Sequence, residues 1–413
     1  MDFTKKYDVA VVGGGIAGAA AALQAARSGK KTVLIEKTVL LGGLATSGLV
    51  YIYLPICDGN GHQASYGITE ELLRNSLEYG PGDIPVCWPN GKNAPESKRF
   101  CCRFSPAAFM LSLEELLLNA GVELWLDTLV CDTECTDSRM TAVVVENESG
   151  RGRIEAGCFV DASGSCILAR RAGLPCRTED NYLTIWALEY ALGINGDFGE
   201  NLNMKFFTAA SLNPPNELII PAELKTRLYP GMTDDEIRKK ITFNGLSGKS
   251  VTEFVTEAHR VLREQFRLHQ EKGVSRKDRY PVKLPLMPQY RKSYCLDAEY
   301  VLKDGENNRT FEDSIGMIPD WRKAGSVWEV PYRSLYTRKM DGLLAAGRCT
   351  GAAGDAWEVT RVIPSAGLTG QVAGLAASMA IDQRKEVWEL DTEELQQNLR
   401  KLGVRIHLPE IGL

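Results

Sequence analysis

The N-terminal stretch of the chain has the hydrophobic pattern of a strand, a helix and a second strand. Asp8–Val12 and Thr32–Ile35 are short runs dominated by apolar, β-branched residues, which predict buried strands. Between them, Ile16–Ser28 is rich in alanine and predicts a helix, with Gly29 as its expected C-cap. This order of elements predicts a parallel βαβ unit and therefore an α/β fold.

Later parts of the chain carry further strand-like runs and amphipathic stretches. The expected strands are 122–130, 140–146 and 153–160, and the expected helices are 69–77, 104–119, 250–272, 363–381 and 391–401. A capping box of Ser250 and Glu253 is expected to begin the longest amphipathic helix, and Gly273 to close it. Gly150-Arg151-Gly152 lies between two strand-like runs, so we expect a hairpin turn there.

Length and composition are those of an ordinary two-domain globular protein. The 413 residues exceed what one simple core accommodates, and 44% are hydrophobic and 24% charged. A formal net charge of −5 gives no reason to expect nucleic acid or anionic membranes as partners. No apolar run reaches the ~20 residues of a membrane helix, and the glycine turn explains the first apolar stretch better than a signal peptide does. We therefore expect a cytoplasmic protein.

The eleven cysteines are scattered and include no Cys-x-x-Cys pair. An odd number without a secretory signal favours reduced thiols in the cytoplasm. The lack of a paired motif separates the chain from disulfide reductases. Cys349 is expected to be packed among small residues; covalent attachment of a cofactor is the alternative.

The turn after the first strand has the spacing Gly-x-Gly-x-x-Gly at Gly13, Gly15 and Gly18, and the second strand ends in Glu36. Gly13 makes the turn, Gly15 allows a pyrophosphate to approach the backbone, and Gly18 allows close packing of helix on strand. The helix N-terminus favours the phosphate charge, and Glu36 can accept hydrogen bonds from a ribose. The sequence thus predicts a dinucleotide-binding unit.

Three further stretches carry a family resemblance: the loop Leu41–Gly48, FVDASG at 159–164, and DGLLAAGRCTGAAGD at 341–355. With the first glycine turn, they resemble the FAD-dependent oxidoreductases of the glutathione-reductase-like fold. The stretches VPYRSLYTRKMDGLLAAGRC (330–349) and DAWEVTRVIP (355–364) resemble more closely a group of bacterial FAD-dependent oxidoreductases. The resemblance covers residues 1–50, about 100–175 and 285–382, and is weak over 176–280.

This resemblance implies FAD as the cofactor, with the N-terminal motif on its ADP half and Asp355 on its ribityl chain. The backbone near Val130 would touch the adenine. The cofactor-binding residues that it implies are Gly13, Gly15, Ala17, Gly18, Glu36, Lys37, Gly42, Gly43, Leu44, Val130, Ala162, Ser163, Gly164, Arg348, Asp355 and Val362.

The implied fold is a Rossmann-like FAD-binding domain with a parallel sheet, plus a mixed α+β substrate domain. The FAD-binding domain would be discontinuous, and residues 51–95 would be an insertion near the active site. The expected ranges are 1–50, 96–175 and 336–385 for the FAD-binding domain, 176–335 for the substrate domain and 386–413 for a helical tail.

Three residues are candidates for catalysis. Arg361 precedes the helix expected to point at the flavin, where it would favour negative charge, and an ion pair with Glu358 that locks domains together is the alternative. Arg291 would clamp a substrate carboxylate, or be an ordinary surface arginine. His62 would be an acid or a flavin contact, or an ordinary loop histidine. No histidine, cysteine or acidic spacing fits a metal site.

Together these observations predict an FAD-dependent oxidoreductase that acts on a small organic molecule by hydride transfer at flavin N5. A flavin monooxygenase and an electron-transfer subunit are the alternatives. Residues 100–340 contain no second complete glycine motif, so no separate nicotinamide-binding domain is expected. Neither nucleic acid nor a membrane is expected as a partner, and a homo-oligomer remains open.

Overall fold

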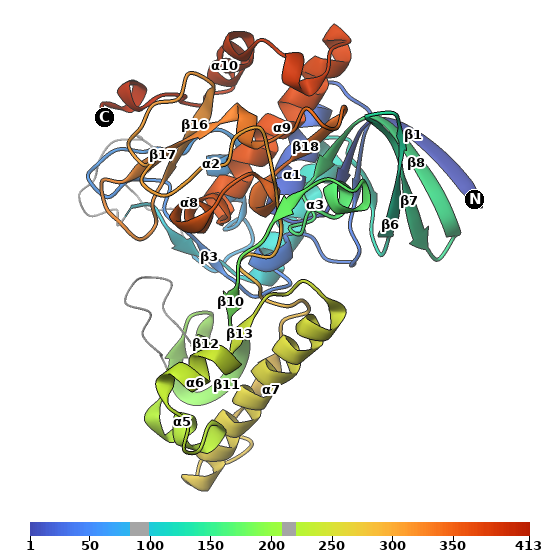
Figure 1. Ribbon diagram of the computed structural model, residues 1–413. Coiled ribbons are helices and arrows are strands. Elements are labelled where there is room, and N and C mark those ends of the chain that lie inside the picture. The colour runs from blue at the N-terminus through green and yellow to red at the C-terminus, as the bar shows by residue number, and fades with distance from the viewer. Residues whose placement is uncertain (83–98, 209–219) are drawn as a thin grey trace. The chain divides into compact units, whose positions relative to one another are not determined.

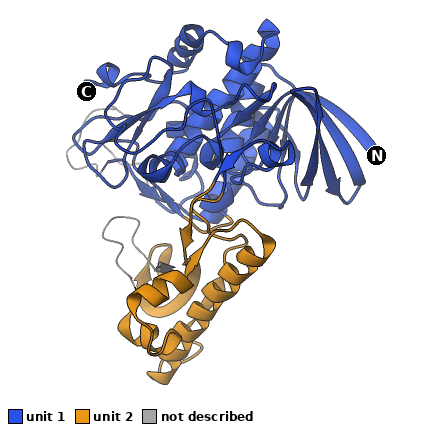
Figure 2. Ribbon diagram, in the orientation of Figure 1, with its two compact units in different colours: residues 1–46, 51–177, 294–413 blue, residues 47–50, 178–293 orange. Residues whose placement is uncertain are grey.

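The protein is described from a computed structural model that covers residues 1–82, 99–208 and 220–413 (Figure 1). The chain divides into two compact units (Figure 2). Unit 1 comprises residues 1–46, 51–177 and 294–413, and unit 2 comprises residues 47–50 and 178–293. Residues 294–335 therefore pack with unit 1, whereas the expected substrate domain extended to residue 335.

Unit 1 is built on a sheet whose central strands are parallel, as predicted. The parallel strands lie in the order β5 (Glu123–Trp125), β2 (Thr32–Ile35), β1 (Phe3–Val12), β8 (Gly150–Asp161) and β18 (Leu343–Ala345). The N-terminal part of β8 also pairs antiparallel with β7 (Arg139–Asn147), which in turn pairs with β6 (Leu129–Thr136). β7 and β8 form the expected hairpin, but its turn lies at Glu148 and Ser149, and Gly150-Arg151-Gly152 already pairs with β7 as the start of β8.

The strand predicted over 122–130 is instead two strands, β5 and β6. Asp127 between them has φ +48°, a left-handed conformation that interrupts an extended chain. Its backbone N–H donates to Thr38 O, and the Thr128 N–H donates to Glu36 O, both at 3.0 Å. The turn redirects the chain from parallel pairing with β2 to antiparallel pairing with β7, and Val130 lies buried in β6.

Two predicted helices, α1 (Ile16–Arg27) and α9 (Ile363–Gln383), are confirmed and pack side by side in unit 1 (Figure 1). Their backbones approach closely because glycines face the contact. A Cβ at Gly370 would overlap Ala17 O, and one at Gly374 would overlap Ala21 O. Small residues in both helices thus allow α9 to pack directly on the helix that follows the glycine turn.

The remaining elements of unit 1 surround this sheet and helix pair. They are η1 (Gly43–Ala45), β3 (Ile52–Tyr53), α2 (Ile68–Asn75), β4 (Cys102–Arg103), α3 (Pro106–Asn119), α4 (Ile167–Arg171), β9 (Cys176–Arg177), β15 (Cys295–Leu296), β16 (Ser314–Pro319), β17 (Val327–Pro331), η3 (Tyr332–Ser334), η4 (Gly347–Cys349), α8 (Gly354–Thr360), η5 (Val387–Glu389), α10 (Thr392–Lys401) and η6 (Leu408–Ile411). The helices expected near 69–77, 104–119 and 391–401 correspond to α2, α3 and α10.

Unit 2 is the mixed α+β part that the fold prediction contained. Its elements are β10 (Asn181–Tyr182), β11 (Thr184–Gly196), β12 (Gly199–Thr208), α5 (Ala222–Leu228), α6 (Asp234–Lys240), β13 (Thr242–Phe243), α7 (Gly248–Glu271) and β14 (Arg279–Lys283). An antiparallel sheet in the order β12-β11-β14 shares one core with α7, to which Phe254, Ala258 and Val261 contribute. This confirms the apolar stripe predicted for the helix.

The expected capping box of Ser250 and Glu253 is wrong. α7 begins two residues earlier, and the Ser247 hydroxyl caps it by accepting a hydrogen bond from the Ser250 N–H at 3.2 Å. The Ser250 hydroxyl instead accepts from the Gly245 N–H at 3.2 Å. Within the described ranges, no helix combines the length and the apolar character needed to cross a membrane.

Candidate functional site

Loops that follow four parallel strands of unit 1 meet at one edge of its sheet. They are the glycine turn after β1, Glu36 after β2, the loop of residues 161–164 after β8 and η4 after β18. A Cβ at Gly13 would lie 2.5 Å from Ala162 O, and the Ala346 N–H donates to Asp161 O at 3.0 Å. Ligands of open α/β sheets bind at this edge, so we take it as the candidate site.

The N-terminus of α1 opens onto this edge without a capping side chain. Gly15 is the N-cap, and the first turn contains no acidic residue. A Cβ built on Gly15 meets nothing within 4 Å, whereas one on Gly18 would overlap Gly13 O. Gly18 therefore serves close packing, and Gly15 borders open space. Amides at an uncapped helix start suit a phosphate.

Glu36 lies beside the glycine turn and is largely buried. Its Oε2 accepts from the Gly14 N–H at 2.7 Å, and its Oε1 accepts from the backbone N–H and the hydroxyl of Thr38, at 3.0 and 2.9 Å. A carboxylate offers about four acceptor positions, so it can still accept from a ligand hydroxyl. The neighbouring Lys37 side chain is exposed.

A second glycine loop, Gly42-Gly43-Leu44, lies on the first. The Gly42 N–H donates to Gly14 O at 2.7 Å, and Gly42 forms an isolated parallel bridge with Gly15. Gly42 and Gly43 both have positive φ, at +93° and +56°. Since these conformations favour glycine, the loop can follow the N-terminus of α1 closely without side chains between them.

The loop after β8 is organised by Asp161, which sequence reasoning did not single out. Its fully buried carboxylate accepts from the Ser163 hydroxyl at 2.6 Å and from the Leu168 N–H at 2.8 Å. Burial raises the pKa of Asp161, and these hydrogen bonds oppose the rise. The stretch FVDASG at 159–164 carried the family resemblance, but the role of its aspartate in ordering the loop was not predicted.

Cys349 is completely buried beside this loop, and the Cys166 N–H donates to its Sγ at 3.3 Å. Its contacts include Cys166 and Asp161, while packing among small residues and covalent attachment of a cofactor both stay predictions. All cysteines among the described residues are free thiols. No group of three or more histidine, cysteine or acidic side chains in the described part of the chain could hold a metal ion.

A cationic side chain, Arg348, lies against the same loop. A Cβ on Gly164 would overlap the Arg348 guanidinium. Burial lowers the pKa of Arg348, and the nearby Arg361 charge lowers it further. The guanidinium places a positive charge beside the loop, and such a charge favours a negatively charged ligand group.

Asp355, in the first turn of α8, has a carboxylate held by two cations. It accepts from Arg322 Nη1 at 2.8 Å and from Lys323 Nζ at 3.1 Å. Burial acts to raise the pKa of Asp355, but these hydrogen bonds outweigh burial and lower it. Arg322 also binds both oxygens of the buried Asp320, at 3.1 and 3.0 Å. Sequence reasoning missed Arg322, which fixes the position of Asp355.

Each catalytic candidate of unit 1 contacts a nearby carboxylate. Arg361 Nε donates to Glu358 Oε2 at 2.9 Å, and both side chains are less than a tenth exposed. The Arg361–Glu358 ion pair that was expected as the alternative therefore exists. It links two neighbouring turns at the end of α8 rather than two domains. His62 Nδ1 lies 3.0 Å from the buried Asp58 Oδ2. Val362 is the N-cap of α9, directly after Arg361.

Arg291 belongs to unit 2. Its Nη1 donates to Gln289 O at 3.0 Å, and its guanidinium lies 6.0 Å from the centre of the Trp186 ring. Its backbone N–H donates to Asn181 Oδ1 at 2.9 Å. These contacts hold the segment 289–292 against the start of β10, which positions the arginine within its own unit.

A family model described as FAD dependent oxidoreductase matches residues 8–184 and 199–399. The chain matches no curated protein. Among solved structures, it is similar to a geranylgeranyl bacteriochlorophyll reductase-like protein from Thermoplasma acidophilum, with 14% identity, a TM-score of 0.48, and 99% of this chain and 94% of that chain covered.

Two further solved structures are similar over most of their length. A p-nitrophenol 4-monooxygenase from Pseudomonas putida has 12% identity and a TM-score of 0.44, with 96% of this chain and 84% of that chain covered. A myxobacterial chondrochloren halogenase dependent on FAD has 13% identity and a TM-score of 0.44, with 96% and 79% covered. What these enzymes act on is a property of those proteins alone.

Proposed function

Because the chain belongs to the FAD-dependent oxidoreductase family, we propose that it oxidises or reduces a small organic molecule with FAD bound at the loop edge of unit 1. The observation that carries the proposal is the open N-terminus of α1. Gly15 leaves space there, no side chain caps the helix, and Glu36 is anchored beside the turn. Phosphate and ribose are the groups that such an edge recognises.

The proposed roles of the cofactor-binding residues follow from these contacts. The amides of α1 would hold the pyrophosphate, Glu36 a ribose hydroxyl, and the loop of Gly42 and Gly43 the adjoining part of the cofactor. Arg348 would compensate negative charge, and Asp355 would accept from ribityl hydroxyls. Bound FAD would supply hydride exchange at its N5. The glutathione-reductase-like subfamily and a bacterial source belong to the same proposal.

The catalytic contribution of the chain would be electrostatic. The N-terminus of α9 carries a partial positive charge, and Arg361 lies just before it. Since the Glu358 carboxylate neutralises part of the Arg361 charge, the N-terminus of α9 would supply much of the preference for a negatively charged group. Asp58 holds His62 through Nδ1, which leaves Nε2 to exchange a proton with a substrate. Arg291 in unit 2 would bind a substrate carboxylate.

Replacing Asp355 by alanine should weaken FAD affinity tenfold or more. Arg322 and Lys323 use two of its acceptor positions, and hydrogen bonds from ribityl hydroxyls to the remaining ones would contribute ~1.5–3 kcal/mol each. Equilibrium titration of apoprotein with FAD measures this. Asp297→Ala, which removes a partly exposed carboxylate paired with Arg177, should leave the affinity unchanged. Equal affinities in the two variants would contradict the proposed role of Asp355.

The source of electrons separates two forms of the proposed activity. In the main form, the substrate itself exchanges hydride with the flavin; in the second, a flavin monooxygenase, NAD(P)H reduces the flavin and oxygen then reacts. Within the described residues, unit 2 has an antiparallel sheet and no glycine-turn βαβ unit that could form a nicotinamide domain. We therefore expect no saturable flavin reduction by micromolar NADH or NADPH.

Anaerobic stopped-flow absorbance tests this expectation. Bleaching by a component of a metabolite pool, with none by the nicotinamides, would support direct hydride transfer. Fast, saturable reduction by a nicotinamide would contradict it and favour the monooxygenase. Bleaching only by a reduced protein would favour an electron-transfer subunit. Cytoplasmic location and a small-molecule partner rather than nucleic acid or membrane remain proposals from composition.

A further inference from the structure

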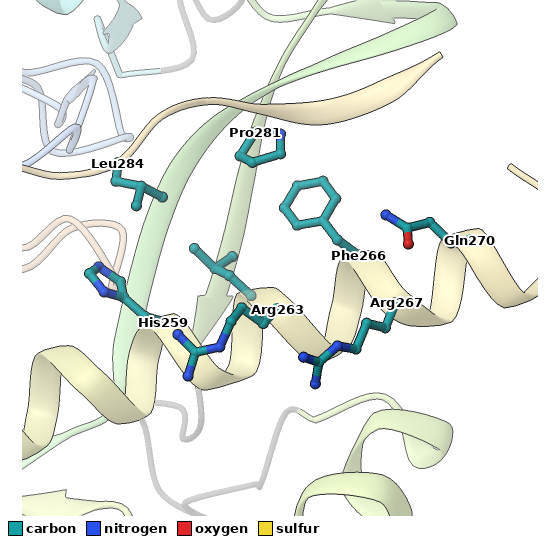
Figure 3. A pocket seen from close by; sticks show the side chains of 8 residues that line it. His259, Arg263, Phe266, Arg267, Gln270, Pro281 and Leu284 are labelled. Carbon is teal, nitrogen blue, oxygen red and sulfur yellow. The ribbon is translucent and has the colours of Figure 1, made fainter. Parts of the chain in front are cut away.

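Unit 2 has a groove between one face of α7 and the segment that contains β14 (Figure 3). The groove encloses about 370 Å³, within the range of small-molecule sites. Leu262 and Phe266 of α7 contribute apolar surface on one side, and Pro281 and Leu284 contribute it on the other. This opening lies outside every residue assigned to FAD.

A second cavity of about 180 Å³ shares His259 with the groove. It is lined mainly by apolar side chains, including Phe254, Val255 and Met287. α7 contributes to both cavities and His259 lines both, so two apolar spaces adjoin along the same helix. This arrangement fits a long, narrow apolar molecule better than a compact polar one.

The charged side chains that line the groove are positive. Arg263 and Arg267 are one turn apart on α7 and line it, and neither cavity has an acidic lining residue. Arg267 pairs with Glu264, but Arg263 has no hydrogen bond or ion pair within the described part of the chain. Arg263 is exposed at the rim of the groove. Burial lowers the pKa of His259, and the Arg263 charge lies close enough to that histidine to lower it further.

We propose that the groove binds an amphipathic carboxylic acid, with its apolar body along α7 and its carboxylate on Arg263. A guanidinium can pair with both carboxylate oxygens, which gives affinity and orientation. Apolar side chains on both walls provide the burial that a chain or ring needs. The groove shares no residue with the proposed FAD site, so the proposal does not depend on the redox assignment.

Decanoate and decan-1-ol form a matched pair of probes, since they share an apolar chain and differ in charge. Isothermal titration of the FAD-loaded protein should show saturable decanoate binding. Arg263→Gln should weaken decanoate binding at least tenfold and leave decan-1-ol binding unchanged, because only the charge partner is lost. Phe266→Ser should weaken both ligands, because it removes part of the apolar wall.

Arg276→Gln is the matched control, because Arg276 is exposed in unit 2 and does not line either cavity. Flavin absorbance is recorded in every titration, so that loss of the cofactor is detected. Absence of decanoate binding, or equal decanoate affinity in the wild type and Arg263→Gln, would overturn the proposal. If the wild type did not retain flavin, this would contradict the assignment of FAD but not the proposed decanoate site.

Discussion

The variant Gly15→Leu should fold normally and purify without FAD. Gly15 has φ −69° and ψ 179°, an extended conformation open to any residue, and its Cβ would meet nothing within 4 Å. A leucine there would project into the space proposed for the pyrophosphate. We expect at least a hundredfold loss of FAD affinity, about 2.8 kcal/mol, with the unfolding free energy of the apoprotein changed by less than about 1 kcal/mol.

The flavin-to-protein absorbance ratio and thermal unfolding by circular dichroism measure the two effects separately. Gly248→Leu is the matched control, because Gly248 also begins a helix and its Cβ would also meet nothing within 4 Å, but it lies in unit 2. It should retain FAD. A Gly15→Leu protein that carries full flavin would place the pyrophosphate elsewhere and overturn the assignment of α1.

Arg322→Met should cause the largest loss of stability. Arg322 and Asp320 are 2% and 1% exposed and form a two-point ion pair, while Arg322 also holds Asp355. Removing the guanidinium leaves the Asp320 carboxylate buried without its cation. Loss of one partner of a buried pair typically costs about 3–5 kcal/mol. Urea unfolding at a fixed FAD concentration, followed by tryptophan fluorescence, measures the change.

The pH dependence of this loss has a defined sign. Arg322 and Lys323 lower the folded-state pKa of Asp355 below its unfolded value. The resulting stability is therefore present above the unfolded pKa of about 3.9 and is lost as pH falls through the folded pKa. The difference between wild type and Arg322→Met should be largest near neutral pH and should narrow below about pH 4.

Arg309→Met is the control for Arg322→Met, because the Arg309 side chain is 60% exposed in its pair with Glu306. A guanidinium that stays hydrated contributes at most about 1 kcal/mol through such a pair, so this variant should unfold nearly as the wild type does. If Arg322→Met were no less stable than Arg309→Met, the buried pair would not stabilise the fold.

The sequence alone determined the first βαβ unit. The strand of 8–12, the helix from Ile16, the strand of 32–35 and the acid at Glu36 are all found where the pattern predicts them. This was possible because the glycine spacing and the helical and strand periodicities are local properties, each complete within a few turns of chain. The same locality made the glycine-rich helix α9 predictable.

Tertiary structure decided the features that depend on distant partners. The break at Asp127 follows from hydrogen bonds of the turn to Thr38 O and Glu36 O. Arg322 and Asp355 are 33 residues apart and meet only after the chain has folded. The packing of residues 294–335 with unit 1 likewise arises from long-range contacts. Such pairings leave no periodic signal in the sequence, because their energy comes from burial and charge brought together by the fold.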